Sequence, residues 1–232
     1  MDILYPLGMG SPWNDNELRY SLRAVEKHLT GWDRVFIIGR KPNWIQNVEF
    51  IEAKDDQGNK EKNIAWKIIK GCQTDISDRF LFMNDDHILC ANTGVNVPYY
   101  YSMTIQQMIL RRNAGNVYRK AMQNTLDVYG FEAKYFDIHV PIVYDKKIFP
   151  EIMESLDWSK DGGYVVKSCY GNAIGAEGEV LQDHKVNTKR TIIEYEAMTH
   201  GRFCFSFGDR TIGPTFRMFM EKLYPQKSKF EK

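Results

Sequence analysis

The sequence predicts an α/β fold in which a mostly parallel central sheet is flanked by helices. Short apolar runs at residues 3–7, 35–38, 48–51 and 80–83 have the length of buried strands. Amphipathic segments separate them at residues 16–29, with Asn14 or Asp15 as the expected cap, and at residues 63–69. This strand and helix order implies right-handed parallel crossovers. With 232 residues, 43% of them hydrophobic, we expect a single domain spanning residues 1–232.

The first strand, residues 3–7, is followed by a loop that contains Gly8 and Gly10. Glycine lets the backbone approach a ligand closely, and such a strand and loop often cradle a nucleotide, so Leu7 and Gly8 are candidate binding positions. The glycines complete neither a G-x-G-x-x-G fingerprint nor a P-loop. The usual dinucleotide and P-loop sites are therefore not indicated.

Charged residues follow the second and third strands. Arg40 comes directly after residues 35–38, where its cation would meet a pyrophosphate or simply face water. Residues 52–62 contain almost no apolar side chain, so we expect them to form a mobile loop over a site. Further candidate contacts lie in or just after this run: Asp55, Asp56, Lys62 and Asn63.

The most informative stretch is residues 78–89, where the apolar run at residues 80–83 ends at Asn84, Asp85 and Asp86. The run is typical of a central strand buried on both faces. Open α/β sheets bind ligands beyond the carboxyl ends of their strands, and oxygen ligands there suit Mg²⁺ or Mn²⁺ carrying phosphates. The alternative is a polar turn in which Asn and Asp serve only the turn geometry.

The second half of the chain carries fewer local signals. Residues 105–128 are expected to form one helix, either a lid or acceptor surface or an ordinary helix with a charged outer face. Its cations are Arg111, Arg112, Arg119 and Lys120. Residues 203–207 are expected to form a strand and residues 215–223 a helix. The charged tail, residues 227–232, is expected to be exposed to solvent or to clamp an acceptor.

Two further segments contain candidate chemical groups. Residues 135–142 alternate like a strand and include Asp137 and His139, although a lone His on such a strand is more often a core residue. Asp183, His184 and Lys185 stand in consecutive positions after an apolar pair. Acid, imidazole and cation are thereby available at one place in the chain.

Several of these segments together resemble a known family. Residues 16–27, 32–38 and 80–86, with Pro42 and Trp44 between them, look like Stealth-type sugar-phosphate transferases and, more broadly, GT-A glycosyltransferases. The match covers about residues 16–89, and the segment around His139 is similar to a His-x-Pro element of Stealth-type proteins. The opening strand lacks the acidic end expected for Stealth proteins, and the chain is short for that family.

The resemblance implies a GT-A-like, Rossmann-like fold with a nucleotide-binding half, residues 1–95, and an acceptor-binding half, residues 96–232, that forms a C-terminal elaboration. It places Asp85 and Asp86 where such enzymes bind Mn²⁺ or Mg²⁺. A late residue, His184 or Asp183, would complete the metal shell or hold the diphosphate. The remaining roles are assigned as follows: Arg40, Lys62 and Lys185 to the diphosphate, Asp55 and Asp56 to the nucleoside, and Asp137, His139 or Asp183 to the base.

The favoured function is a metal-dependent glycosyltransferase that moves a sugar from a nucleoside-diphosphate sugar to a glycan, a protein or a modified nucleic acid. The first alternative is a Stealth-type transferase of a sugar-1-phosphate. The second is a non-catalytic nucleotide- or carbohydrate-binding module with a structural acidic cluster. An NAD-dependent oxidoreductase is least favoured because the glycine fingerprint is missing.

Composition bears on the partners and the cellular location of the protein. The 31 basic and 30 acidic residues give a formal charge of +1, which argues against dominant nonspecific binding to nucleic acid. The 4 cysteines are widely spaced and are expected to be buried, reduced thiols. The opening residues do not resemble a signal peptide and no apolar stretch reaches membrane-spanning length, so a cytoplasmic location is expected.

Overall fold

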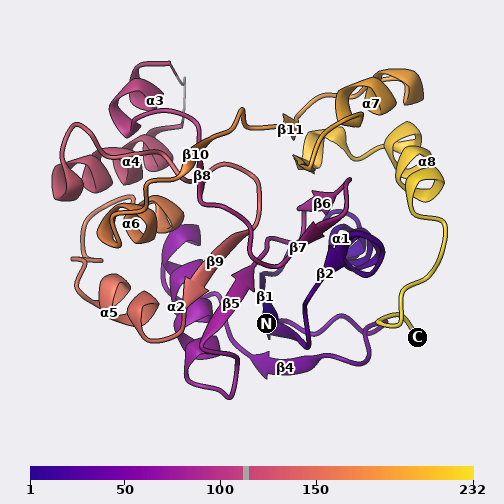
Figure 1. Cartoon of the computed structure of the whole chain (residues 1–232), viewed down its shortest axis with the longest axis horizontal. Coiled ribbons are helices and arrows are strands. Elements are labelled where there is room, and N and C mark those ends of the chain that lie inside the picture. Colours follow the sequence, from indigo (N-terminus) through magenta and orange to yellow (C-terminus); the bar gives the residue numbers. More distant parts are fainter. Residues whose placement is uncertain (112–114) are drawn as a thin grey trace.

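A computed structural model describes residues 1–111 and 115–232 and confirms the mixed α/β fold (Figure 1). The main sheet has five strands in the order β4-β3-β1-β5-β9. The first four pair in parallel and the last is antiparallel to its neighbour. Their bounds are β1, Asp2–Leu7; β3, Val35–Gly39; β4, Glu49–Glu52; β5, Arg79–Phe82; and β9, Ile142–Asp145.

Strand β1 lies at the centre of the sheet, between β3 and β5. Its Leu4 stands opposite Phe36 on one side and Phe82 on the other. The strand expected to be central, at residues 80–83, is therefore β5, one position away from the middle. Strand β5 is nevertheless covered on both faces, since Phe80, Leu81 and Phe82 are buried.

Helices cover both faces of the sheet (Figure 1). Helix α1, Asn16–His28, packs its apolar side on the face that contains Tyr5, Ile37 and Leu81. Helices α2, Lys60–Cys72; α5, Ile148–Glu154; and α6, Val166–Ala173, cover the face of Leu4, Phe36 and Phe80. Gly71 lets α2 approach β1 closely, because a Cβ there would lie 2.4 Å from a methyl carbon of Leu4.

Helix α1 begins without the predicted side-chain cap. Asp15 occupies the cap position with φ of 57°, but its carboxylate pairs with Arg40 instead of the helix. The loop is held by Ser11, whose hydroxyl oxygen accepts from the backbone N–H of Asp15 at 2.8 Å and donates to Glu17 at 2.7 Å. At its other end the chain passes from α1 into β2, Leu29–Thr30, which pairs with β7, Thr93–Gly94.

The polar run at residues 52–62 is shorter as a loop than predicted. Helix α2 already begins at Lys60, because the side chain of Asn59 caps it by accepting from the backbone N–H of Lys62 at 2.8 Å. The rest of the loop is tied down by Asn63, whose side-chain oxygen accepts from the backbone N–H of Gln57 at 2.9 Å. Residues 60 and 61 therefore stand on a helix end beside the sheet.

The segment between residues 105 and 128 is two helices, not one. These are α3, Ile105–Arg111, and α4, Asn116–Tyr129. Arg112 lies outside the described residues. Two smaller sheets lie in the rest of the chain. One has the order β11-β12-β6, with bounds Lys185–Val186, Cys204–Phe207 and Ile88–Leu89. The other pairs β8, Tyr100–Tyr101, with β10, Glu179–Val180. The last helices are α7, Ile192–Thr199; η1, Asp209–Thr211; and α8, Pro214–Leu223, as expected for residues 215–223.

The prediction of a strand at residues 135–142 is wrong for most of this range, because β9 begins only at Ile142. The preceding backbone is irregular: Tyr135 still bonds to the backbone of Ser102 and Met103, but residues after it bond to side chains. The N–H of Phe136 donates to the Ser168 hydroxyl at 3.0 Å, and the N–H of His139 donates to Asp183 at 2.9 Å. These hydrogen bonds hold residues 136–139 across the carboxyl ends of the strands of the main sheet.

The charged tail, residues 227–232, is exposed only in part: its three lysines are exposed, but Ser228, Phe230 and Glu231 are buried. Glu231 is buried and forms two hydrogen bonds of 2.7 Å with the guanidinium of Arg23 on α1. Burial alone raises the pKa of Glu231, but the bonds from Arg23 hold it below its ordinary value. Phe230 is buried as well, so the tail closes the α1 side of the core.

All four cysteines are free thiols, and Cys72, Cys169 and Cys204 are buried as predicted. Among the described residues, no helix combines the length and the apolar character needed to cross a membrane.

Candidate active site

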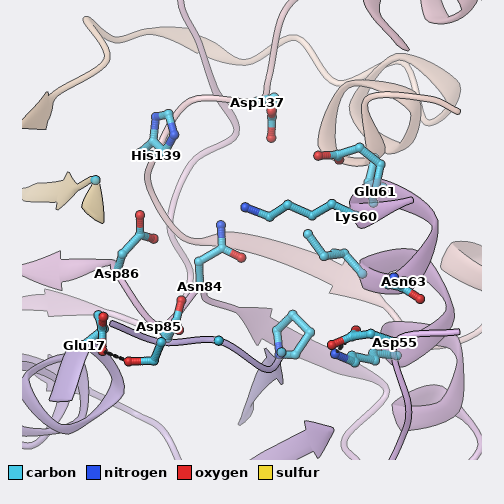
Figure 2. Close-up of a pocket in the computed structure, with 18 of the residues that line it drawn as sticks. Glu17, Asp55, Lys60, Glu61, Asn63, Asn84, Asp85, Asp86, Asp137 and His139 are labelled. Carbon is cyan, nitrogen blue, oxygen red and sulfur yellow. Dashed lines mark hydrogen bonds and ion pairs between the residues drawn. The ribbon is translucent and has the colours of Figure 1, made fainter. Parts of the chain in front are cut away.

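A pocket of about 840 Å³ opens at the carboxyl ends of β1 and β5 (Figure 2). The loop after β1 forms one wall, from Gly8 to Pro12, and the first turn of α2 forms another. The irregular segment containing His139 passes over the strand ends. Thus the pocket collects residues from both predicted halves of the chain.

Asn84, Asp85 and Asp86 all line the pocket, directly after β5. Burial, and then the neighbouring carboxylates of Asp86 and Glu17, raise the pKa of Asp85 to about 7. The carboxylate of Asp86 lies 3.2 Å from Nζ of Lys185. The predicted acidic cluster is therefore assembled at the predicted place.

His87, which follows this cluster, faces the core. It is fully buried, and its Nδ1 accepts a hydrogen bond of 3.3 Å from the backbone N–H of Asn84. Burial lowers the pKa of His87 well below its ordinary value, so the ring is neutral. It supports the turn that presents the two carboxylates.

Four lysines bring positive charge to the pocket: Lys60, Lys67, Lys167 and Lys185. Figure 2 shows Lys60 reaching from α2 toward the centre of the pocket, between Asn84 and Asp137. Lys67 is buried; its Nζ donates to the backbone carbonyl of Leu7 at 2.9 Å and also bonds to Asp55. An anionic ligand would thus meet cations on several walls.

Lys167 is buried below the segment that carries His139. Its Nζ donates to the backbone carbonyls of Ile138 and Val140, each at 2.8 Å. Burial lowers the pKa of Lys167, and the nearby carboxylate of Asp137 works in the opposite direction. Lys167 therefore anchors both sides of the turn at His139.

His139 forms a pair with Asp183. The carboxylate of Asp183 lies 2.8 Å from Nδ1 of His139 and also accepts the backbone N–H of the same residue. Burial alone raises the pKa of Asp183, but the hydrogen bonds with His139 hold it below its ordinary value. His139 lines the pocket, whereas Asp183 stands behind it. An ionised Asp183 fixes the N–H of His139 at Nδ1 and leaves Nε2 to accept a proton.

On the α2 side of the pocket, Glu61 faces Asp137 (Figure 2). Asp137 is bound by the hydroxyl of Tyr118, which also lies 2.7 Å from the hydroxyl of Tyr135. Burial raises the pKa of Glu61 to about 8, and the carboxylate of Asp137 contributes next. Glu61 therefore keeps its proton at neutral pH.

Other predicted contacts are brought together only in part. Gly8, Asp55 and Asn63 line the pocket. Leu7 is buried and offers its carbonyl to Lys67. Four other candidates do not line the pocket: Arg40, Asp56, Lys62 and His184. Arg40 pairs with Asp15, and Asp56 accepts a hydrogen bond from Gln57. Lys62 lies over the Trp66 ring, and Nε2 of His184 has no hydrogen-bond partner among the described residues.

A metal ion would find two adjacent carboxylates here, but not a complete protein shell. In residues 1–111 and 115–232, no three His, Cys, Asp or Glu side chains stand close enough together to hold a metal ion. His184 in particular is not gathered with Asp85 and Asp86. Mg²⁺ is commonly held by one or two carboxylates together with substrate phosphates, so the two residues fit an ion that arrives with a diphosphate.

Sequence reasoning missed Lys60, Glu61, Lys67, Lys167 and Tyr144 as pocket residues. Lys167 could have been predicted, because it is the one charged residue in the largely apolar run from Tyr164 to Tyr170. A lysine in such a run is buried only when it has polar partners. Lys60 and Glu61 were hidden by their place in a polar run that looked like a loop.

This sheet between helices, with a polar pocket at its strand ends, is the fold of the GT-A glycosyltransferases. No protein-family model matches the chain, and no match is found among curated proteins. The solved structure of the galactosyltransferase LgtC in complex with donor and acceptor sugar analogs aligns with a TM-score of 0.52 and 12% identity, over 100% of this chain and 98% of that chain.

An active-site mutant of LgtC aligns with a TM-score of 0.54 and 12% identity, over 100% of this chain and 98% of that one. The apo structure of WbbM, a bifunctional glycosyltransferase, aligns with a TM-score of 0.56 and 11% identity, over 98% of this chain and 50% of that one. At such low identity these likenesses concern the fold.

Proposed function

We propose that this protein is a glycosyltransferase that moves a sugar from a nucleoside-diphosphate sugar to an acceptor hydroxyl. One observation carries the proposal: a single pocket combines the acidic pair Asp85 and Asp86, several lysines and the pair of His139 with Asp183. The acids suit a metal-bound diphosphate, the lysines suit its negative charge, and the imidazole suits proton transfer. The likeness to LgtC, whose structure contains donor and acceptor sugar analogs, supports this reading.

In this proposal Asp85 and Asp86 hold Mn²⁺ or Mg²⁺ together with the diphosphate. When bound, such an ion offsets the negative charge that develops on the departing group. Lys60 and Lys185 reach the same space and stabilise that charge directly. Lys185 must then exchange part of its contact with Asp86 for the phosphate. Asp55 and Gly8, at the β1 end of the pocket, are assigned to the nucleoside.

His139 is the base. An oxygen of the acceptor bonds to the anomeric carbon, while the bond from that carbon to the diphosphate breaks and its electron pair leaves with the diphosphate. The acceptor proton passes to Nε2 of His139. Asp183 acts through His139 as a positioning residue, because its carboxylate bonds to Nδ1 and to the backbone. This modifies the earlier expectation that Asp183 itself is catalytic.

The test is to incubate the protein with UDP-, GDP- and dTDP-sugars in the presence of Mn²⁺ and to measure release of the nucleoside diphosphate. We expect slow hydrolysis of at least one donor, faster turnover with an acceptor, and loss of both in the Asp86→Asn variant. Binding of donors without any turnover would favour a binding module. A product that retains a phosphodiester would favour transfer of a sugar-1-phosphate.

A further inference from the structure

A basic surface extends outward from the pocket over the C-terminal part of the chain. We call it the basic rim and define it by Lys185, Lys189, Arg210 and Arg217. These residues lie on β11, on the loop that follows it, on η1 and on α8. Residues 185–217 contain six Lys or Arg and three Asp or Glu, whereas the whole chain has a formal charge of only +1. The excess of positive charge is therefore local.

The fold brings the members of the rim next to one another. Lys185 lies beside Gly208, because a Cβ there would be 3.8 Å from Cε of the lysine. Lys189 lies beside Gly213, where a Cβ would be 3.6 Å from its Cε. The short helix η1 connects these two glycines and carries Arg210. The two lysines thus stand at the two ends of the segment that contains Arg210.

Most of the charge of the rim is not neutralised by carboxylates. Lys189, Arg210 and Arg217 are exposed, and none of them takes part in an ion pair within residues 1–111 and 115–232. Asp209 stands among them and leaves an excess of cations. The guanidinium of Arg217 lies over the Trp13 ring, 5.7 Å from its centroid. This contact orients the guanidinium and leaves its N–H groups available as donors.

The rim begins next to the proposed base. Asp183, which orients His139, is followed two residues later by Lys185, whose Nζ lies 3.2 Å from Asp86. The other three members of the rim do not line the pocket. A donor diphosphate inside the pocket therefore does not account for them. An acceptor that presents its hydroxyl to Nε2 of His139 and extends past Lys185 would lie across the rim.

We propose that the basic rim binds a phosphate group of the acceptor, so that the protein transfers its sugar to a phosphorylated acceptor. Arginine and lysine donate strong, charge-assisted hydrogen bonds to phosphate oxygens, and arginine does so with two parallel bonds. A surface with an excess of cations also attracts an anion from a distance. The inference rests on the proposed function and adds to it the chemical class of the acceptor.

Two double variants test the proposal. The rim variant, Lys189→Gln with Arg217→Gln, removes two exposed charges outside the pocket and leaves Lys185 in place. The control variant, Lys147→Gln with Arg119→Gln, also removes one lysine and one arginine that are exposed and outside the pocket. Figure 1 shows α4, which carries Arg119, on the opposite side of the molecule from α8. Melting temperatures verify that both variants are folded.

The first measurement compares acceptors that differ only in a phosphate, with a donor that the parent protein hydrolyses. The pairs are glucose, galactose, mannose and N-acetylglucosamine with their 6-phosphates, and glycerol with glycerol 3-phosphate. We expect kcat/KM for at least one phosphorylated acceptor to exceed that for its neutral partner by about tenfold or more, the factor that one charge-assisted hydrogen bond supplies. High salt should reduce this preference, and the rim variant should lose it while the control variant keeps it. Equal use of both members of every pair, or an unchanged preference in the rim variant, overturns the inference.

The second measurement needs no nucleotide and separates this inference from the proposed function. Saturation-transfer NMR with the same pairs should give a stronger signal for a phosphorylated compound than for its neutral partner, and the rim variant should lose the difference. If phosphorylated compounds bind through the rim while no nucleotide sugar is hydrolysed, the proposed function fails but the phosphate site stands. If donors are hydrolysed but no compound binds through the rim, the inference is overturned and the proposed function stands. Rim-dependent sedimentation with phosphatidylglycerol vesicles, without binding of the soluble phosphates, would identify a membrane contact and also overturn it.

Discussion

The carboxylate of Asp183 holds His139 at two points, by accepting the backbone N–H at 2.9 Å and by contacting the ring Nδ1 at 2.8 Å. The two residues are 44 positions apart in the chain. Lys167 fixes the same turn from below through the carbonyls of Ile138 and Val140. The imidazole at the edge of the pocket is therefore held in one orientation before any ligand arrives. Such preorganisation is what a proton acceptor requires.

The first prediction concerns this pair. His139→Ala should lower kcat by about 10²- to 10⁴-fold, because a positioned base contributes on that scale. Asp183→Asn should lower kcat by a smaller factor, because the imidazole remains but loses its orienting carboxylate. The donor KM should change little in both variants, since the interaction acts mainly in the transition state.

Steady-state kinetics with a donor that the parent protein hydrolyses provides the measurement. The exposed Asp127→Asn variant on α4 serves as the control and should behave like the parent. If the His139→Ala protein melts at a lower temperature but turns over normally, His139 is a structural residue.

The second prediction addresses the acidic pair. A nucleoside diphosphate with Mn²⁺ at 100 times its dissociation constant stabilises a protein by about 2.7 kcal/mol. For a domain of this size the melting temperature then rises by about 5–10 °C. The Asp86→Asn variant should lose most of this Mn²⁺-dependent rise, because the amide keeps the shape but not the charge. An equal rise in variant and parent, measured by thermal shift, would exclude Asp86 from the metal site.

Lys185 allows a sharper version of that experiment. It lies 3.2 Å from Asp86 and competes with a metal ion for the same carboxylate. Lys185→Gln should therefore increase the response to Mn²⁺ alone and decrease the response to the diphosphate. A variant that weakens or strengthens both responses together would show that Lys185 does not have this double role.

The third prediction is a pH dependence of stability. Burial and Asp137 raise the pKa of Glu61 to about 8 from an ordinary value of 4.5. Between these values the folded protein keeps a proton that the unfolded chain has released, so the contribution of Glu61 to stability falls as the pH rises from about 4.5 to about 8. The loss amounts to at most about 1.4 kcal/mol per pH unit.

The Glu61→Gln variant cannot titrate and should therefore gain stability relative to the parent as the pH increases from 5 to 8. Urea unfolding at a series of pH values measures the difference. A constant difference across this range would mean that Glu61 has an ordinary pKa.

The fourth prediction separates anchoring from stability. Lys167→Met leaves two buried carbonyls without their donor and should cost about 1–3 kcal/mol. It should also lower kcat, because the turn at His139 loses its support. Lys146 is a matched control, since its Nζ also donates to two backbone carbonyls, of Thr74 at 2.6 Å and Ile76 at 3.1 Å, but outside the pocket. Lys146→Met should lose stability and keep its kcat, and an equal loss of kcat in both variants would argue against the anchor.

The sequence by itself determined the layered α/β fold and the position of the acidic pair. Both depend on local information: the length of an apolar run indicates a buried strand, and whatever follows β5 must lie at the ligand-binding edge of the sheet. The loop after β1 was recognised for the same reason, because Gly8 follows a buried strand. Strand ends in a parallel sheet meet regardless of how far apart they are in the chain.

Only the tertiary structure decided which side chains bind one another. Asp183 meets His139, and Glu231 becomes buried because Arg23, 208 positions away, offers two hydrogen bonds. Nothing in the pattern around Glu231 predicts such a partner, so a charged tail looked exposed. The segment at residues 135–141 alternates like a strand, yet the backbone of residues 136, 138, 139 and 140 bonds to side chains from elsewhere. Its conformation depends on contacts between distant residues, and these contacts exist only after the whole chain has packed.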